Sequence, residues 1–395
     1  MAQSSNNSDN LSEIDKILCR AEKLREKSLY RQALRLFKKA LQGYRKIHDR
    51  EGLLHCMISL GDIYRMVGNF DLAARSYKDT IKLASQINPV KVADAQVGLG
   101  LSLRAQGKWK EAIKLIRKSK SIYKKKDDRQ GIAFTLWAEA GALRIKGDIR
   151  NAIRTFKESY TIFKAMKDPH GVGYCLCGLG GTSRIAGLFR DSLNYYKDAN
   201  KLFSSIDDTF GRAYSYCGIG NAYRMLSDYD NAFTHFSKAV RLYKKIGDKV
   251  SYAYTLWGLG TAYKMASNIK KTHYFLMKAR QLFQATKDPR GLVYCRLGFG
   301  EIALLKGNKA IAKRHLLAAR KESKKNNFAI EGCYADTLIS FMNETNPYSP
   351  PFRKGGLGRL RRLAEERGFS RKIDNTCYNQ LGLKIRFQGL PFNIP

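Results

Sequence analysis

The sequence predicts an all-α solenoid, a row of stacked antiparallel helix pairs. Three observations lead to this prediction. One basic side chain recurs about every 40 residues through most of the chain, columns of small and large residues keep the same spacing, and apolar residues recur at helical intervals within each half unit. Because neither helix of such a pair can bury its apolar stripe alone, neighbouring pairs must stack.

The period is marked by a basic residue near the end of the first helix of each unit. The equivalent positions are Arg25, Arg65, Arg104, Arg144, Arg184, Arg224, Lys264 and Leu304. One step is 39 residues and the others are 40, which predicts eight repeats between about residues 15 and 325. Residues 328–342 continue the pattern and predict one more first helix, which caps the array.

The first helix of each unit is defined by small residues. A glycine four positions before the basic column, as at Gly61, lets two helices approach closely, and a large residue such as Tyr77 fills the space opposite. The helix is expected to end three positions after the column, where a left-handed backbone favours glycine. These positions include Gly68, Gly107, Gly147 and Gly187.

The second helix of each unit is predicted from its apolar stripe, as in Ala152, Phe156 and Phe163. Several units then run on to an Asp-x-x-Gly sequence, for example from Asp128 to Gly131. The 39-residue step carries Pro89 instead, which predicts that one helix ends or the next begins there.

These columns resemble the tetratricopeptide repeat family. Its pattern of a large residue, Leu-Gly, Tyr, Ala and an aromatic residue is present as Met57-x2-Leu60-Gly61-x2-Tyr64 and Ala73-x3-Tyr77. Units of 40 residues are similar to those of Pins-type polarity adaptors and of some bacterial regulatory repeat proteins. HEAT and armadillo repeats have a similar period, but the Leu-Gly-x2-Tyr register argues against them. The resemblance covers about residues 15–345 and implies a right-handed superhelix whose first helices line a concave groove.

The chain is expected to divide into three segments. Residues 1–12 are predicted to be a disordered N-terminus, residues 13–345 the solenoid with its capping helix, and residues 346–395 a basic, poorly ordered tail with several prolines and glycines. No apolar stretch is long enough to span a membrane, and the N-terminus has no leader pattern, so we expect a cytoplasmic protein. The eight cysteines favour small buried thiols over metal ligands or disulfides. Oligomeric state is not defined by the sequence.

No catalytic constellation is present, so we expect neither an enzyme nor a cofactor. The six histidines do not recur in one column and have no metal-ligand spacing, and Gly178-Leu-Gly-Gly has no following Lys-Ser or Lys-Thr that would make a phosphate loop. Function must be argued from a site, and the repeats supply one of a different kind.

The candidate site is a pair of ladders on the first helices. One is cationic: Arg65, Arg104, Arg144, Arg184, Arg224 and Lys264. The other stands ten residues earlier in each repeat and is aromatic: Phe134, Tyr174, Tyr214, Tyr254, Tyr294 and Tyr334. The floor between them holds small or polar residues, Gly141, Gly181, Asn221 and Thr261. Because arginine binds carboxylates with two hydrogen bonds and tyrosine gives rigid contact area, we predict that an acidic peptide or helix binds there.

Other interpretations of these columns stay open. Each arginine could instead pair with a carboxylate or carbonyl of the next repeat, and each tyrosine could pack between adjacent first helices. Trp137 and Trp257, at equivalent repeat positions, fit either the groove or the core. The partner-binding hypothesis predicts that Arg144, Arg184 and Arg224 are exposed to solvent on the inner face.

The net charge supports a second hypothesis. Lys and Arg number 72 against 34 Asp and Glu, a net charge of +38, most of it in the repeats. A basic column on the second helices, Lys38, Lys78, Arg117, Lys157 and Lys197, suits nucleic acid or an anionic surface, although a solvated outer face explains it as well.

Overall fold

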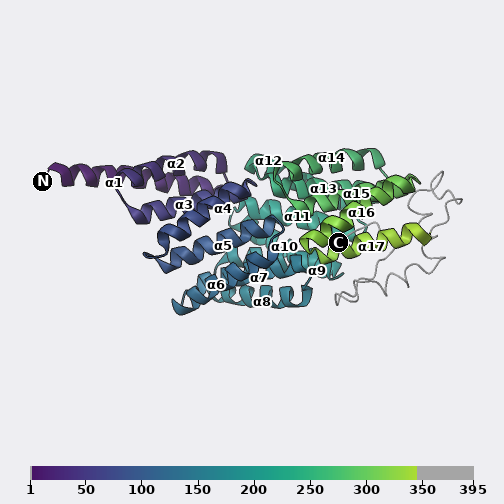
Figure 1. Ribbon diagram of the computed structural model, residues 1–395, viewed down its shortest axis with the longest axis horizontal. Helices are drawn as coiled ribbons and strands as arrows, with labels where there is room; N and C mark the ends of the chain where they lie inside the picture. Colours follow the sequence, from purple (N-terminus) through teal and green to yellow (C-terminus); the bar gives the residue numbers. More distant parts are fainter. Residues whose placement is uncertain (1, 345–395) are drawn as a thin grey trace.

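The computed structural model of the protein describes residues 2–344 and confirms the all-α solenoid (Figure 1). The described residues form seventeen helices, eight antiparallel pairs and a capping helix. The first helices of the pairs are α1 (Ala2–Glu26), α3 (Arg50–Met66), α5 (Pro89–Ala105), α7 (Arg129–Lys146), α9 (Pro169–Ile185), α11 (Thr209–Met225), α13 (Lys249–Met265) and α15 (Pro289–Leu305). The second helices are α2 (Tyr30–Lys46), α4 (Phe70–Ala84), α6 (Trp109–Lys125), α8 (Ile149–Ala165), α10 (Phe189–Ser205), α12 (Tyr229–Ile246), α14 (Ile269–Ala285) and α16 (Lys309–Asn326). The cap is α17 (Ala329–Glu344).

Local chemistry sets the helix boundaries where the sequence predicted them. The predicted glycines after the first helices have positive φ, for example +80° at Gly68 and +91° at Gly147. The recurring Asp-x-x-Gly sequence is an N-cap, because the Asp128 carboxylate accepts a hydrogen bond of 2.8 Å from the Gly131 N–H. Pro89 is the first residue of α5, which Asn88 caps. These devices separate the helices into units of nearly equal length.

First and second helices differ in burial. The second helices bury one stripe, as in α8, where Ala152, Phe156 and Phe163 are buried and most of the opposite face is exposed. The first helices are covered on several sides, and residues 177–183 of α9 are all buried. Close approach requires glycine there, since a Cβ at Gly178 would lie 2.3 Å from the Phe156 ring. The first helices therefore form the inner layer of the superhelix.

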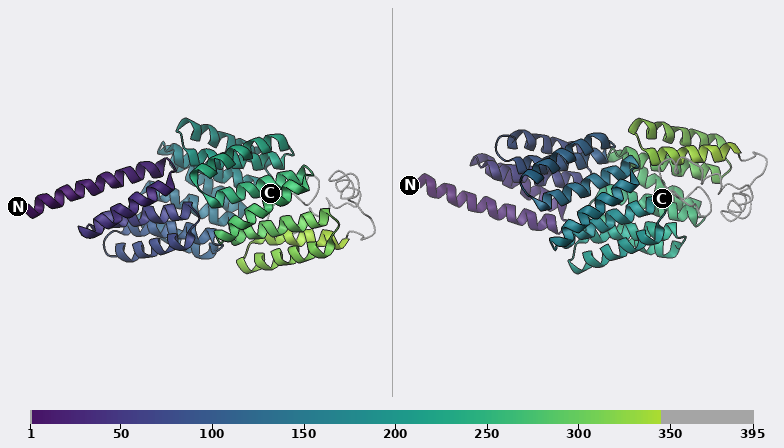
Figure 2. Two further views of the ribbon diagram at one scale, coloured as in Figure 1. Left: turned by 90° about the horizontal axis from the view of Figure 1, so that it is seen from above. Right: turned by 90° about the horizontal axis from the view of Figure 1, so that it is seen from below.

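The superhelix turns far enough for its last repeats to pack on its early ones (Figures 1 and 2). The Trp109 indole N–H donates to the Asn327 carbonyl oxygen at 3.2 Å. Lys287 Nζ lies 2.6 Å from Asp71 Oδ2. A Cβ at Gly68 would be only 2.8 Å from the Thr286 side chain. We call this set of contacts, from residues 68–147 to residues 250–330, the seam.

Apolar packing supports the seam. Ile145 and Ile149, from the fourth repeat, belong to the same buried cluster as Phe328 and Ile330 at the end of the array. A second cluster joins residues of α2 and α3 to Tyr243 at the end of α12. The inner layer is therefore enclosed between successive turns of the superhelix.

The expected segments need correction at the N-terminus. Residues 1–12 were predicted to be disordered, but α1 begins at Ala2, and its N-terminal end projects beyond the other helices (Figure 2). No proline or glycine interrupts residues 2–26, so the helix of the first repeat extends through the polar segment. The predicted tail, residues 346–395, lies outside the described residues.

Six of the cysteines in the described part of the chain are free thiols, and Cys56, Cys175, Cys177 and Cys295 among them are buried, as predicted. Cys333 differs from that prediction, because it is disulfide-bonded. Among residues 2–344, no helix combines the length and apolar character needed to cross a bilayer.

Candidate functional site

The cationic column lies on the inner layer, and several of its side chains reach the next repeat. We call Arg65, Arg104, Arg144, Arg184, Arg224 and Lys264 the inner ladder. A Cβ placed at Gly141 would lie 2.1 Å from Arg104 Nη1, and one at Gly181 would lie 2.5 Å from Arg144 Nη1. The guanidinium groups therefore rest on the backbone of the following first helix, and these glycines make room for them.

Both ends of the ladder are neutralised by carboxylates. Arg65 pairs with Asp62 at 3.2 Å, and Lys264 pairs with Glu301 at 2.5 Å. In the first repeat, Arg25 pairs with Glu22 at 2.6 Å. The three acids occupy one repeat position, three residues before the basic column. We call this position the neutralising column: Glu22, Asp62, Leu101, Gly141, Gly181, Asn221, Thr261 and Glu301.

The middle of the ladder has no such acids, because the neutralising column is apolar, small or uncharged there. Within the described part of the chain, Arg104, Arg144 and Arg184 make no ion pair and no hydrogen bond to a side chain or to the backbone. Arg144 Nε, Arg184 Nε and Arg184 Nη1 are buried without a hydrogen-bond partner. Buried donors without partners are rare in folded proteins and ask for an explanation. Arg65 Nε also has no partner although Arg65 pairs with Asp62, so what distinguishes the middle of the ladder is the lack of carboxylate pairs.

The charges on the ladder repel one another. Burial, together with the positive charges of Arg144, Arg65 and Arg290, lowers the pKa of Arg104 to about 10. Burial and the charge of Arg184 lower the pKa of Arg224 to about 9. All of these side chains remain charged at neutral pH, so the interior keeps an excess of positive charge.

The expected exposure of the ladder is only partly met. Arg144 and Arg184 are half-buried, but Arg224 is fully buried, so the prediction that it faces solvent is wrong. Its guanidinium donates to Asn221 Oδ1 and lies 5.5 Å over the ring of Trp257. Lys264 is also buried, in its pair with Glu301. At these two positions the ladder is a structural element.

The tyrosine column packs between adjacent first helices, one of the two interpretations left open. The Tyr174 hydroxyl donates to Asp208 at 3.0 Å, and the buried Tyr294 donates to Glu331 at 2.8 Å. Tyr214 and Tyr254 are half-buried, and Tyr254 packs edge-on against Phe283.

The tyrosines face the same interior as the ladder. Burial raises the pKa of Tyr294, while the charges of Arg290 and Arg184 act in the opposite direction. The Tyr214 hydroxyl likewise interacts with the charge of Arg104 and favours its charged form. The two columns therefore influence one another electrostatically within the inner layer.

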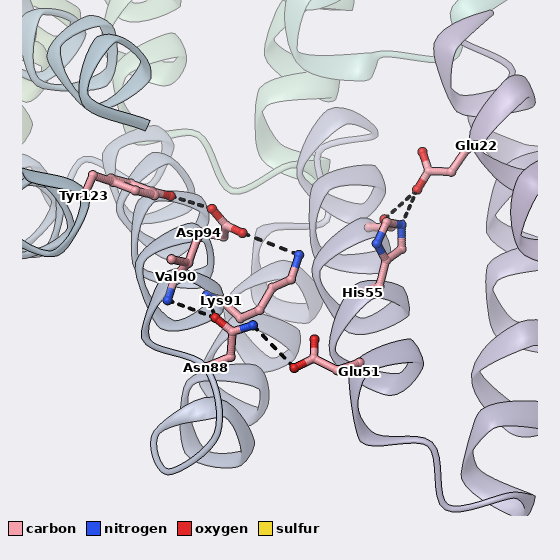
Figure 3. A network of polar contacts seen from close by, with 9 residues as sticks. Glu22, Glu51, His55, Asn88, Val90, Lys91, Asp94 and Tyr123 are labelled. Atoms are coloured by element: carbon pink, nitrogen blue, oxygen red, sulfur yellow. Dashed lines mark hydrogen bonds and ion pairs between the residues drawn. The ribbon is translucent and has the colours of Figure 1, made fainter. Parts of the chain in front are cut away.

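Polar residues at the N-terminal end of this layer satisfy one another (Figure 3). There the aromatic column becomes Asp15, His55 and Asp94. Tyr123 donates to Asp94 at 2.5 Å, and His55 contacts Glu22 at 2.8 Å. At this end of the inner layer, Asp94 and Glu22 therefore have partners within the protein.

The outer basic column is exposed along its length: Lys38, Lys78, Arg117, Lys157 and Lys197 all face solvent on the second helices. Arg117 is the only one of these five that forms an ion pair within the described residues, with Glu139 at 2.7 Å. The outer basic column is therefore exposed to solvent and accessible to a partner.

A superhelix of helix pairs that presents one side chain per repeat on its inner wall defines a helical-repeat interaction protein. The model of the tetratricopeptide repeat matches residues 14–86, 91–165 and 211–285. The chain belongs to the tetratricopeptide repeat family, whose arrays are protein-binding scaffolds. No curated protein matches the sequence.

Several solved structures share the fold. A Rap protein complexed with competence and sporulation factor is 13% identical, with a TM-score of 0.57 over 84% of this chain and 98% of that one. The Rap conjugation gene regulator of plasmid pLS20, in complex with the Phr* peptide, is 13% identical, with a TM-score of 0.60 over 79% and 96%. NprR in complex with its cognate peptide NprX is 16% identical, with a TM-score of 0.53 over 85% and 100%. At these identities the likeness establishes the fold.

Proposed function

We propose that the protein is a non-enzymatic scaffold that binds an acidic peptide or helix along the middle of its inner ladder. The observation that carries the proposal is that Arg104, Arg144 and Arg184 lack carboxylate partners, whereas the ladder residues Arg65 and Lys264 have them. A partner's carboxylates would take the places that Asp62 and Glu301 fill at the two ends.

The physical chemistry of the middle stretch favours this kind of partner. A half-buried guanidinium without a partner costs free energy, and a bidentate carboxylate recovers it with a strong, oriented pair of hydrogen bonds. Adjacent packed helices lie about 8–10 Å apart, and an extended chain advances about 3.3 Å per residue. One acidic residue in every three would therefore meet successive arginines.

The structural neighbours support a peptide as the partner. Three proteins with this fold are described as complexes with competence and sporulation factor, the Phr* peptide and the peptide NprX. They support the peptide class of ligand, and the acidic character follows from the inner ladder of this chain.

The proposal is tested with a fluorescent peptide of the repeating sequence Glu-Gly-Ser, measured by anisotropy against a matched peptide with Gln in place of Glu. Arg144→Glu with Arg184→Glu is expected to weaken binding of the acidic peptide at least tenfold. The control is Lys157→Glu, which makes the same kind of charge change on the outer face. Equal binding of the Glu and Gln peptides, or loss of binding in the control alone, would refute the proposal.

A second candidate is nucleic-acid binding through the outer face, favoured by the exposure of the whole outer basic column. Binding of single-stranded RNA should then fall steeply with salt, because phosphate contacts release counterions. Lys157→Glu with Lys197→Glu should weaken it, whereas the inner double variant should not. Absence of salt-dependent RNA binding removes this candidate.

We keep the cytoplasm as the proposed location. The six free thiols support it, and the Cys333 disulfide argues against it. Cell fractionation with thiol trapping tests both statements.

A further inference from the structure

One repeat position on the first helices, outside the ladder and the tyrosine column, holds either a tryptophan or a cysteine in the central repeats. Thirty-three residues after each central ladder arginine stands a residue of the next first helix. After Arg104 and Arg224 it is tryptophan, Trp137 and Trp257. After Arg144 and Arg184 it is cysteine, Cys177 and Cys217. The largest kind of side chain and one of the smallest thus occupy equivalent places.

Each of the two indoles lies under a ladder arginine of the preceding repeat. Arg104 lies 5.8 Å from the centre of the Trp137 ring, and Arg224 lies 5.5 Å from that of Trp257. On its other side Trp137 packs edge-on against Tyr174, with ring centres 6.4 Å apart.

Trp257 packs against Tyr294 at the equivalent place, with ring centres 4.7 Å apart. Each indole therefore contacts both the ladder arginine of the preceding repeat and the tyrosine of the following one. This three-part stack recurs 120 residues apart.

The cysteines cannot make this contact, because their side chains end one atom beyond Cβ. Cys177 is completely covered, whereas Cys217 stays partly open to solvent. The equivalent neighbours of Cys217 are Arg184 and Tyr254, both half-buried. Burial raises the pKa of the Cys217 thiol, and the positive charge of Arg184 acts in the opposite direction.

A second, independent observation leads to the same place. Arg184 is the ladder residue with two buried nitrogens, Nε and Nη1, that have no hydrogen-bond partner. Among the described residues no carboxylate pairs with this guanidinium, and the side chain at the position of the two indoles is the small, partly exposed Cys217.

We propose that Arg184, Cys217 and Tyr254 form an anchoring subsite for an acidic residue of the bound segment and an aromatic side chain next to it. The inference rests on the proposed function and names its partner more closely. The carboxylate pairs with the half-buried Arg184 guanidinium, and the aromatic ring contacts Arg184 and Tyr254, as Trp137 contacts Arg104 and Tyr174 and as Trp257 contacts Arg224 and Tyr294. The partner is an acidic peptide with a tryptophan or another large flat side chain beside one of its acids.

The test compares two fluorescent peptides, the Glu-Gly-Ser repeat and the same peptide with Trp after a central Glu. The Trp peptide should bind the wild-type protein about 3- to 10-fold more tightly, the range expected for one aromatic contact. Cys217→Trp fills the subsite with the protein's own indole and should remove this gain. Cys217→Ser, which keeps the size of the side chain, should retain it.

A second measurement does not depend on the fold of the Cys217→Trp variant. In the wild-type protein, the Trp peptide should slow alkylation of Cys217 by iodoacetamide, followed by mass spectrometry of the Cys217 fragment. The Glu-Gly-Ser peptide without Trp should protect it less. Exposed Cys19 serves as the internal control, since its alkylation should not change.

The outcomes separate the two proposals. If both peptides bind equally well and Cys217 is not protected, the subsite is overturned while acidic-peptide binding stands. If Cys217→Trp keeps the gain from the Trp residue of the peptide, the subsite is again wrong. If neither peptide binds the wild-type protein, the proposed function itself fails.

Discussion

Lys264 and Glu301 form a buried ion pair, with Nζ 2.5 Å from Oε2, at the last cationic position of the inner ladder. Tyr334 donates a further hydrogen bond of 2.5 Å to the same carboxylate. The pair joins consecutive repeats and shows how a ladder cation is satisfied when the neutralising column supplies an acid. Arg144 meets Gly181 at the equivalent place and has no such acid.

Breaking this pair should be costly. Lys264→Met leaves Glu301 buried without its counterion, and we expect a loss of about 3–5 kcal/mol of unfolding free energy. Lys264→Met with Glu301→Gln removes both charges and should recover much of that loss, because the amide oxygen introduced by the second substitution still accepts from Tyr334. Urea unfolding followed by circular dichroism measures both. Strictly additive effects of the two substitutions would show that the residues are not coupled.

The central arginines should respond in the opposite direction. Arg144→Gln or Arg184→Gln removes a cation that is repelled by its neighbours and has buried nitrogens without partners. We expect each change to leave stability unchanged or to raise it by about 0.5–2 kcal/mol, the usual pattern where a binding site is strained. Thermal unfolding is the measurement. A loss of stability would favour the strut interpretation for these residues.

Asn221→Asp places an acid in the neutralising column without a change of shape. The new carboxylate lies against Arg224, whose guanidinium already donates to Asn221 Oδ1 at 3.2 Å. Position 221 also stands 37 residues after Arg184, the spacing that joins Glu301 to Lys264. The carboxylate should therefore compete with the partner for Arg184 and weaken binding of the Glu-Gly-Ser peptide about tenfold, which corresponds to about 1.4 kcal/mol. Asn194→Asp, on the exposed face of α10, adds the same charge far from the ladder and should leave binding unchanged.

Stability should depend on Glu22 at acid pH. Burial favours its protonated form, but hydrogen bonds and charges from His55 and Arg25 outweigh that effect and lower the pKa of Glu22 from 4.5 to about 2. Because the folded-state pKa is depressed, the stabilisation is complete above pH 4.5 and is lost as pH falls toward 2. We expect about 2 kcal/mol from this group.

The control for this effect is Glu22→Gln, which cannot titrate. Wild-type protein should exceed it in unfolding free energy at about pH 6, and the difference should shrink between pH 4.5 and 2. A constant difference over that range would contradict the assignment.

The seam should be a separate source of stability. Trp109→Ala removes the hydrogen bond to the Asn327 carbonyl and an aromatic contact between turns, and a cost of about 1–3 kcal/mol is expected. Hydrogen exchange should become faster in α16 and α17, which lie far from Trp109 in the sequence. Trp109→Phe keeps an aromatic ring and loses the N–H, so its unfolding free energy should lie between those of the wild-type protein and Trp109→Ala. Faster exchange confined to α6 would mean that the turns are held together elsewhere.

Much of the architecture was predictable because it depends on local chemistry. The left-handed glycine at Gly147 and the first residue of α5 at Pro89 follow from rules that need only a few neighbouring residues. The neutralising column is also visible in the sequence, as Glu22, Asp62 and Glu301 at one repeat position. Its importance becomes clear only when the ion pairs show that these acids satisfy ladder cations.

The burial of Arg224 and the seam were not predictable in the same way. The seam depends on how small rotations between repeats add up along the array, and periodicity gives the order of the repeats without their curvature. The burial of Arg224 depends on which side chains of neighbouring repeats meet it. The stack of Arg224, Trp257 and Tyr294 also joins three repeats. The repeat period alone places Cys217 at the position equivalent to these tryptophans, and the folded arrangement shows what the tryptophans contact there.

The seam also limits how this array can evolve. A solenoid with two free ends can gain or lose a repeat, since each unit touches only its neighbours. Here Trp109 must meet Asn327, and Asp71 must meet Lys287, so one duplicated unit between them would move every such partner 40 positions out of place. The contacts of the seam therefore fix the number of repeats between its two sides.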